Sequence, residues 1–368
     1  MKKLIFRKFI LDHTKFLFSS LIIMSVIIWT IQAVNFFDFV TEDGHGLKVY
    51  FFYTILNFPK ITHRILPFIY FISLFYIIRQ YEIKNEINIF WINGISKLKL
   101  AKELVFYSFI IMVFQILIGS SISPKFQNDA RSYLKNSNVD FFTSLLKQGK
   151  FINITKGLTI FINKKNKDGT YSEIFLEDSL SNSSKMIYAK KAILIDDANI
   201  KVLQLFNGKV INKNLSKVNI FEFEKIDFNL NNLVSNTITV PKIQEMKTSH
   251  LISCFVDNIK KKIEFVVDCN KDIKTEIKQE LIKRLVKPIY IPLITLLCCY
   301  QFLYSRFKTN FNKKINYIFF ANFLLILLSE VSLRYSSKSN ITTFLYLLIP
   351  FVLYVIFYLI FSAKSKNA

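Results

Sequence analysis

Several long runs of this sequence contain no charged residue, and this constrains the fold more than any other feature. The first run, 16–37, has 22 residues. At a rise of about 1.5 Å per residue, a helix of that length crosses a hydrocarbon core about 30 Å thick. Three further runs lie at 104–124, 288–305 and 339–363. Because a bilayer core offers backbone groups no water, these runs predict membrane-spanning helices.

Two weaker apolar regions complete a predicted set of six spans. Region 50–78 is interrupted by Lys60, His63 and Arg64, and region 315–329 ends at Glu330, beyond which a span would extend toward Arg334. With the N-terminus in the cytoplasm, the cytoplasmic segments carry sixteen Lys and Arg against three on the opposite side. Cytoplasmic loops are enriched in Lys and Arg. Omitting either weak span would invert every later loop, so the asymmetry supports all six.

The formal net charge of +23 would also suit a nucleic-acid partner. However, the aromatic residues lie within the apolar runs and do not alternate with Arg, as they do on a base-stacking surface. We therefore expect no nucleic-acid partner. The basic residues are expected to face anionic lipid headgroups or to fix orientation in the membrane.

The segment between the third and fourth spans, about 125–280, is then expected outside the cytoplasm, and its pattern predicts strands. Polar and apolar residues partly alternate on both sides of Asp168-Gly169, which predicts a hairpin. A second hairpin, with a type I′ turn, is predicted at Asn207-Gly208. We also expect a strand at 218–230, a short helix at 248–257 and a helix at 272–287 that leads into the fourth span.

The sequence lacks the common signatures of catalysis. No stretch fits G-x-x-x-x-G-K-[ST], H-E-x-x-H or G-x-S-x-G, and the four histidines are scattered. We expect no catalytic residue, metal or cofactor, so nucleotide energy must come from a partner. Cys298 and Cys299 are expected to pack within a span, whereas Cys254 and Cys269 could form a disulfide or remain free thiols, and we favour free thiols.

Two groups of residues are candidate sites. The first is a set of cations at the outer ends of the spans, and it comprises Lys60, Arg64, Arg284, Lys287 and Arg334. Such side chains can extend toward lipid headgroups. Alternatively they line a cavity for an anionic lipid, since an ionised group in hydrocarbon is costly unless it has a partner.

The second candidate site is the predicted cytoplasmic helix at 81–96, which Gly94 ends. Ile83, Ile87 and Phe90 are predicted to share its apolar face, with Glu86 beside them. Such a helix can lie on the inner leaflet. Alternatively it docks in the groove of a cytoplasmic motor, with Glu86 paired to a basic residue at the rim.

Short motifs in a fixed order connect these sites to a known family. They are Ile65-Leu66-Pro67, Asn85-Glu86-Ile87, Asn93-Gly94-Ile95-Ser96-Lys97, and Glu280-Leu281 followed by Arg284 and Pro288. With the arrangement of three spans, a domain and three spans, the chain resembles the LptF/LptG permeases of the lipopolysaccharide exporter. The hairpin at Asp168-Gly169-Thr170 is more similar to the F-type subunit.

The resemblance implies a polytopic α-helical membrane protein of the bacterial inner membrane, with both termini cytoplasmic and a periplasmic β-jellyroll inserted between two sets of three transmembrane helices. The expected domains are 1–124, 125–280 and 281–368. The implied partners are a cytoplasmic ABC ATPase dimer, a second six-span permease, periplasmic bridge proteins and lipopolysaccharide. A membrane-bound enzyme or a structural anchor acting on envelope lipids is the alternative. Gln32 and Asn35 stand where family members carry basic residues, which weakens the case for lipid contacts by the first span.

Overall fold

The computed structural model describes residues 2–37, 40, 46–136, 148–155, 158–166, 168–180, 183–197, 200–214, 217–229, 242–256, 271–306 and 310–366. Cα packing divides the chain into two compact units. The first comprises Met1–Val34, Tyr53–Arg131 and Pro241–Ala368, and the second Asn35–Phe52 and Ser132–Val240. All the candidate site residues belong to the first unit.

Six helical segments are long and apolar enough to cross a membrane, so the six predicted spans are confirmed, the two weak ones included. They are Lys3–Asn35, Leu47–Ile83, Lys97–Leu134, Ile273–Leu303, Phe311–Tyr335 and Asn340–Lys366. The corresponding helices are α1 (Lys2–Asn35), α3 (Leu47–Leu56), α4 (Phe58–Ile83), α6 (Lys97–Leu117), α7 (Ser123–Asn136), α11 (Lys271–Leu281), α12 (Tyr290–Cys299), α13 (Phe311–Tyr335) and α14 (Asn340–Lys366).

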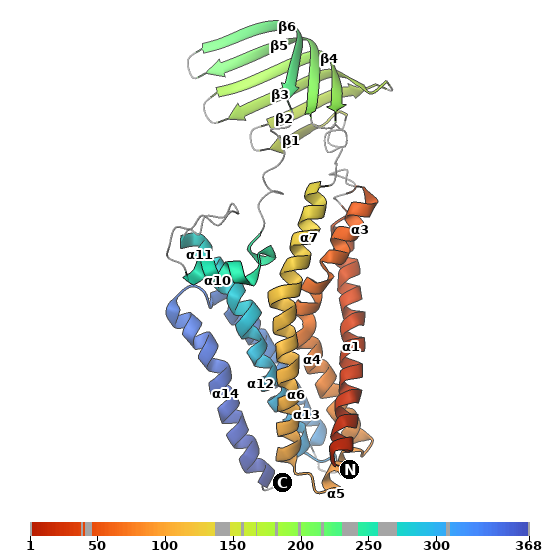
Figure 1. The fold of residues 1–368 in the computed structure, drawn as a ribbon, viewed down its shortest axis with the longest axis vertical. Coiled ribbons are helices and arrows are strands. Elements are labelled where there is room, and N and C mark those ends of the chain that lie inside the picture. The colour runs from red at the N-terminus through yellow and green to blue at the C-terminus, as the bar shows by residue number, and fades with distance from the viewer. Residues whose placement is uncertain are drawn as a thin grey trace. The chain divides into compact units, whose positions relative to one another are not determined.

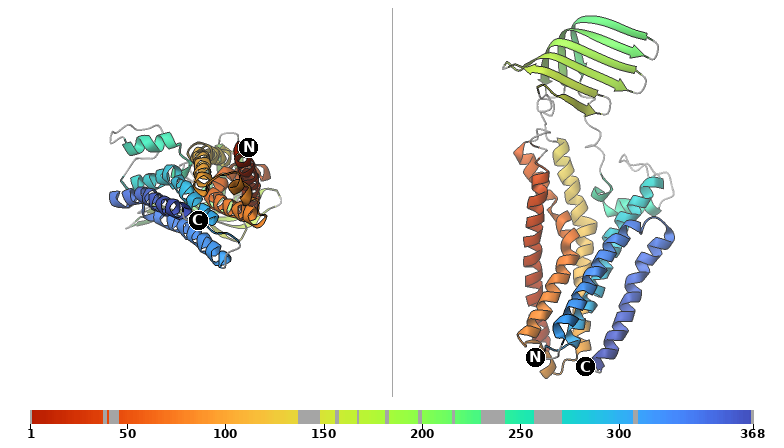
Figure 2. Two further views of the ribbon diagram at one scale, coloured as in Figure 1. Left: turned by 90° about the horizontal axis from the view of Figure 1, so that it is seen from below. Right: turned by 180° about the vertical axis from the view of Figure 1, so that it is seen from behind.

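Helix α12 is the centre of the first unit. Every one of its residues is buried, and it packs against α4, α6, α13 and α14 (Figure 1). By contrast, the most apolar windows of α1 and α14 are only 22% and 17% buried. A helix that is apolar on all sides and exposed on most of them suits a bilayer, where lipid covers the outward face. Figure 2 shows α14 at the edge of this unit.

Two spans contain a π-helical turn, which is rare in proteins and common at functional sites. One is η1 (Ile118–Ile122), between α6 and α7, and the other is η4 (Ile282–Val286), which follows α11. They contact each other. In η1, a Cβ at Gly119 would overlap the ring of His63, so only glycine lets α4 come this close. The helical segment that contains η1 runs continuously through position 124, where the sequence predicted a domain boundary.

The predicted β-rich insert is confirmed as one antiparallel sheet of six strands (Figure 1). The strands are β1 (Phe151–Thr155), β2 (Leu158–Lys165), β3 (Thr170–Leu180), β4 (Ser183–Asp197), β5 (Ile200–Asn214) and β6 (Lys217–Asn229). Each strand pairs with its neighbour in the sequence. A jelly roll is built from two Greek keys, and the described strands contain no such crossover, so they form a meander.

A crease crosses the sheet where Glu173, Lys190 and Asn207 lie on adjacent strands. Glu173, Lys190 and Asn207 are absent from the strand pairing, although Ile174 beside them pairs with Ala189. Glu173 and Asn207 have φ angles of 52° and 50°. On each side of the crease, buried side chains occupy every second position of a strand. Across the crease this alternation shifts by one residue. Because the sheet bends there, both halves bury their apolar side chains in one cluster.

The crease corrects one of the two predicted hairpins. The turn at Asp168-Gly169 is confirmed: Gly169 has φ 78°, and Asp168 accepts hydrogen bonds from the hydroxyl and amide of Thr170, which lower its carboxyl pKa. Asn207-Gly208, however, lies within the continuous strand β5. A type I′ turn needs positive φ at both residues, and only Asn207 has one. Gly208 is required instead by crowding, since a Cβ there would overlap the carbonyl oxygen of Tyr188.

One cysteine prediction is also corrected. Cys254, in α10 (Thr248–Val256), is disulfide-bonded, so the favoured free thiol is wrong there, and Cys269 lies outside the described residues. Among the described residues, the apolar cluster around Cys254 has Leu251 and Ile277 as its further buried members. Cores this small commonly depend on a disulfide. Cys298 and Cys299 are free and buried in α12, as predicted.

Candidate functional site

Arg284 lies in η4 with only 1% of its surface exposed. Its Nε donates to Oε1 of Glu280 at 2.9 Å, one turn earlier. Its terminal nitrogens donate to the carbonyl oxygens of Gln244 and Met246 and to the hydroxyl of Thr248, each at 2.9 Å. The guanidinium therefore ties the segment before α10 to the start of the fourth span.

Lys287 is also occupied, because it forms an ion pair with Glu330 of α13 and is only 7% exposed. Lys60 is half-buried and Arg64 is exposed on α4, and both line a cavity of about 20 Å³ together with His63, Arg284 and Glu280. Such a volume holds about one water molecule. Nδ1 of His63 is buried there without a hydrogen-bond partner.

The structure therefore brings together three of the five predicted lipid-binding cations. Lys60, Arg64 and Arg284 share the small cavity, Lys287 does not line it and pairs with Glu330, and Arg334 is exposed at the end of α13. The sequence analysis missed a neighbouring pair, in which Arg131 of α7 donates to Glu245 at 2.9 Å. That pair joins segments 114 positions apart, and no local sequence pattern predicts it.

At the other end of the spans, the predicted helix at 81–96 is divided. Helix α4 continues to Ile83, Asn85 breaks it with φ 57°, and α5 covers only Ile87–Ile92. Gly94, with φ 66°, ends α5 as predicted. Its amide donates to Trp91 and the Ile95 amide donates to Phe90, which is the hydrogen-bond pattern of a Schellman motif.

The predicted apolar face of this helix is turned inward. Ile87 and Phe90 are 2% and 1% exposed, and the ring of Phe90 meets those of Phe6 and Phe9 of α1 edge to face. In this structure Ile87 and Phe90 therefore pack into the core and do not face outward. The exposed apolar residues are Ile83, Ile89 and Ile92, with 39%, 46% and 84% of their surface accessible.

Glu86 stands at the start of α5, where a carboxylate is favourable toward the helix N-terminus. Its nearest cation is Lys8, with 3.9 Å between Nζ and Oε2 and both side chains partly exposed. An exposed pair of this kind contributes about 0–1 kcal/mol. Glu86 therefore remains available to a partner.

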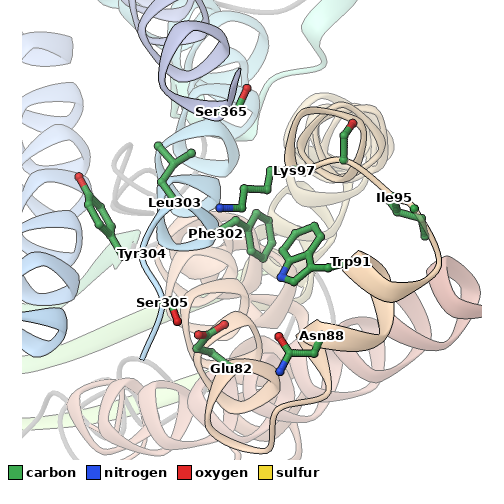
Figure 3. Close-up of a pocket in the computed structure, with 12 residues that line it drawn as sticks. Glu82, Asn88, Trp91, Ile95, Lys97, Phe302, Leu303, Tyr304, Ser305 and Ser365 are labelled. Atoms are coloured by element: carbon green, nitrogen blue, oxygen red, sulfur yellow. The ribbon is translucent and has the colours of Figure 1, made fainter. Parts of the chain in front are cut away.

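A cavity of about 630 Å³ opens beside α5 (Figure 3). Trp91 and Phe302 form part of its wall and meet edge to face at 6.3 Å, and Glu82, Asn88 and Lys97 add polar groups. Glu82 also accepts a hydrogen bond from the Arg306 amide at 3.1 Å. The cavity thus lies between α5 and the connection that follows η6 (Tyr300–Leu303).

A buried polar network, which the sequence analysis did not identify, lies close to α5. His13 of α1 contacts the hydroxyls of Ser73 and Tyr107 at 3.1 and 3.3 Å. Tyr70 contacts Thr295 of α12 at 2.7 Å, and Tyr81 donates to Asp12 at 2.6 Å. Hydrogen bonds between helices stabilise packing in a bilayer, where apolar burial gives little driving force. They join α1, α4, α6 and α12.

Six membrane-capable helical segments, one of which contains the buried central helix α12, are interrupted by a β-rich insert and define a multi-pass α-helical membrane protein. Within the described ranges, no three His, Cys, Asp or Glu side chains gather as metal ligands. The chain belongs to the lipopolysaccharide export system permease family LptF/LptG, which it matches over residues 7–364. It is also 24% identical over 183 residues to an uncharacterized protein of Rickettsia prowazekii (strain Madrid E). That match covers 50% of this chain and 51% of the relative, so the chain spans about half the length of the curated protein it matches.

Proposed function

We propose that this chain is a permease subunit of an ABC-type lipopolysaccharide exporter driven by a separate ATPase dimer. The observation that carries the proposal is the construction of α5. Ile89 and Ile92 are exposed on one side, while Ile87 and Phe90 fix the other side in the core. A short helix held in this way transmits a push from a motor to α1, α4 and α6. The cavity beside it can receive a second element of that motor.

The proposed orientation places both termini in the cytoplasm of a bacterial inner membrane and the β sheet in the periplasm. It rests on the excess of Lys and Arg in the connections assigned to the cytoplasm. Reporter domains fused after Lys97 and after Asn153 are expected to report opposite sides of the membrane. Finding both reporters on one side would contradict this orientation and the location of the sheet.

The proposed cargo is lipopolysaccharide, taken from the outer leaflet and passed to periplasmic bridge proteins. Lys60, Arg64 and Arg334 are the cations that we assign to its anionic headgroup, since none of them has a described ion pair. We propose that Arg284 and Lys287 instead stabilise the fold and do not bind the lipid. Both are buried and paired, so either would have to give up a partner to bind lipid.

The proposed assembly also contains a second six-span permease. The exposed apolar sides of α1, α13 and α14 suit either lipid or another helical unit. We expect purification from the native membrane to recover an ATPase and a second permease in fixed ratio. A membrane-bound enzyme or a structural anchor would purify without an ATPase, and that result would overturn the exporter proposal.

A further inference from the structure

An apolar groove of about 230 Å³ lies between α6, α12 and α14, apart from both candidate sites. Its floor is buried and consists of Ala101, Val105, Leu296 and Phe361. Its rim is formed by Phe106 and Phe109 of α6 and by Tyr354 and Tyr358 of α14, and the two tyrosine rings stack with centroids 6.3 Å apart.

The groove has a cation at one end. Lys102 lines it one turn before Phe106, and is five residues from the start of α6 at Lys97. Lys102 is exposed and belongs to none of the described ion pairs. In the proposed orientation, which this inference takes from the proposed function, the start of α6 lies at the cytoplasmic surface. Lys102 then stands at the level of the lipid phosphates, with the apolar walls extending into the hydrocarbon.

This arrangement has the two parts of a lipid site. An elongated apolar groove that opens sideways between spanning helices is reached from the bilayer, so an acyl chain suits its walls. A lysine near the membrane surface is attracted to an anionic headgroup, and the attraction falls off within a Debye length, which is about 8 Å at physiological salt. Because Ala101 is small, the floor stays open beneath the rim of aromatic rings.

We propose that the groove binds one anionic phospholipid of the cytoplasmic leaflet, with its phosphate at Lys102 and an acyl chain between α6 and α14. This site is distinct from the proposed lipopolysaccharide site, because its cation and walls include none of those residues. The bound lipid fills the space between α14 and α6 and so steadies the last span.

The test uses the purified full chain without any ATPase, so that it does not depend on the exporter activity. The chain is stripped of lipid in detergent and titrated with phosphatidylglycerol or with phosphatidylcholine of the same acyl chains, and bound lipid is counted by native mass spectrometry. We expect phosphatidylglycerol to bind about tenfold more tightly, and Lys102→Gln to remove that preference, as expected for the loss of a charge-assisted contact.

Lys99→Gln is the matched control, because Lys99 is exposed on the same turn of α6 but does not line the groove. It should keep the preference. Val105→Trp fills the floor and should abolish tight binding of both lipids, with Val113→Trp, on the exposed side of α6, as its control. Equal binding of both lipids, or a Lys99 effect as large as that of Lys102, would overturn the proposal. Failure of the ATPase to copurify would not affect this result.

Discussion

Replacing Arg284 with Met is expected to lower the free energy of unfolding by about 3–5 kcal/mol, because it leaves the half-buried Glu280 without its closest charge partner. The carbonyl oxygens of Gln244 and Met246 lose their donors in the same step. The segment before α10 should then detach from η4. Thermal unfolding in detergent measures the loss, and limited proteolysis near position 246 detects the detached segment.

Two variants separate this structural role from lipid binding. Lys283→Met removes the other cation beside Glu280, but Lys283 is 25% exposed, so we expect a loss of only about 0–1 kcal/mol. Adding Glu280→Gln to Arg284→Met should recover part of the stability, because the carboxylate that lost its buried partner is then neutral, while Lys283, 25% exposed, can be solvated. If Arg284→Met kept full stability and lost only lipopolysaccharide capture, the original lipid-binding assignment would stand.

Replacing Ile92 with Asp is expected to disconnect the motor without disturbing the fold. Ile92 is 84% exposed, so the isolated protein should keep its melting temperature. In the proposed complex the same side chain fills the ATPase groove, where a charge would be buried without a partner. Residues at such centres cost about 2 kcal/mol or more when changed. Recovery of the ATPase should therefore fall by roughly 30-fold.

The contrast with Phe90 makes the test decisive. Phe90→Ala should destabilise the protein itself by about 3–5 kcal/mol, because its ring is buried against α1. Lys313→Asp, at an exposed position near the start of α13, is the control for surface charge. If Ile92→Asp recovered the ATPase as well as the unchanged chain does, α5 would not be the docking element.

The spans could be predicted from the sequence because length and charge decide them locally. The face of α5 that packs into the core could not be predicted in this way. Ile87, Ile89, Phe90 and Ile92 are all apolar within six residues, so no periodicity chooses a face. The choice comes from Phe6 and Phe9, which lie about 80 positions earlier in the chain.

At the cation site, one contact of Arg284 could likewise be predicted from the local sequence and the others could not. Glu280 and Arg284 are four residues apart on a helix, so their ion pair was readable from the sequence. The carbonyl partners of Arg284 lie 38 and 40 positions earlier, and only the folded chain brings them there. At Asn207-Gly208 a strong local turn signal failed, because the pairing of β5 with both its neighbours outweighed it.

The burial of α12 has a consequence for synthesis. Tyr70 in the second span hydrogen-bonds Thr295 in the fourth, 225 positions later in the chain. At about 5–20 residues per second, a ribosome needs roughly 10–45 s to cover that distance. For that time the Tyr70 hydroxyl has no final partner, and the faces of α4 and, once it is made, α6 that will cover α12 remain open. Because translation runs from the N-terminus, these helix faces must be covered by something other than α12 until α12 has been synthesised.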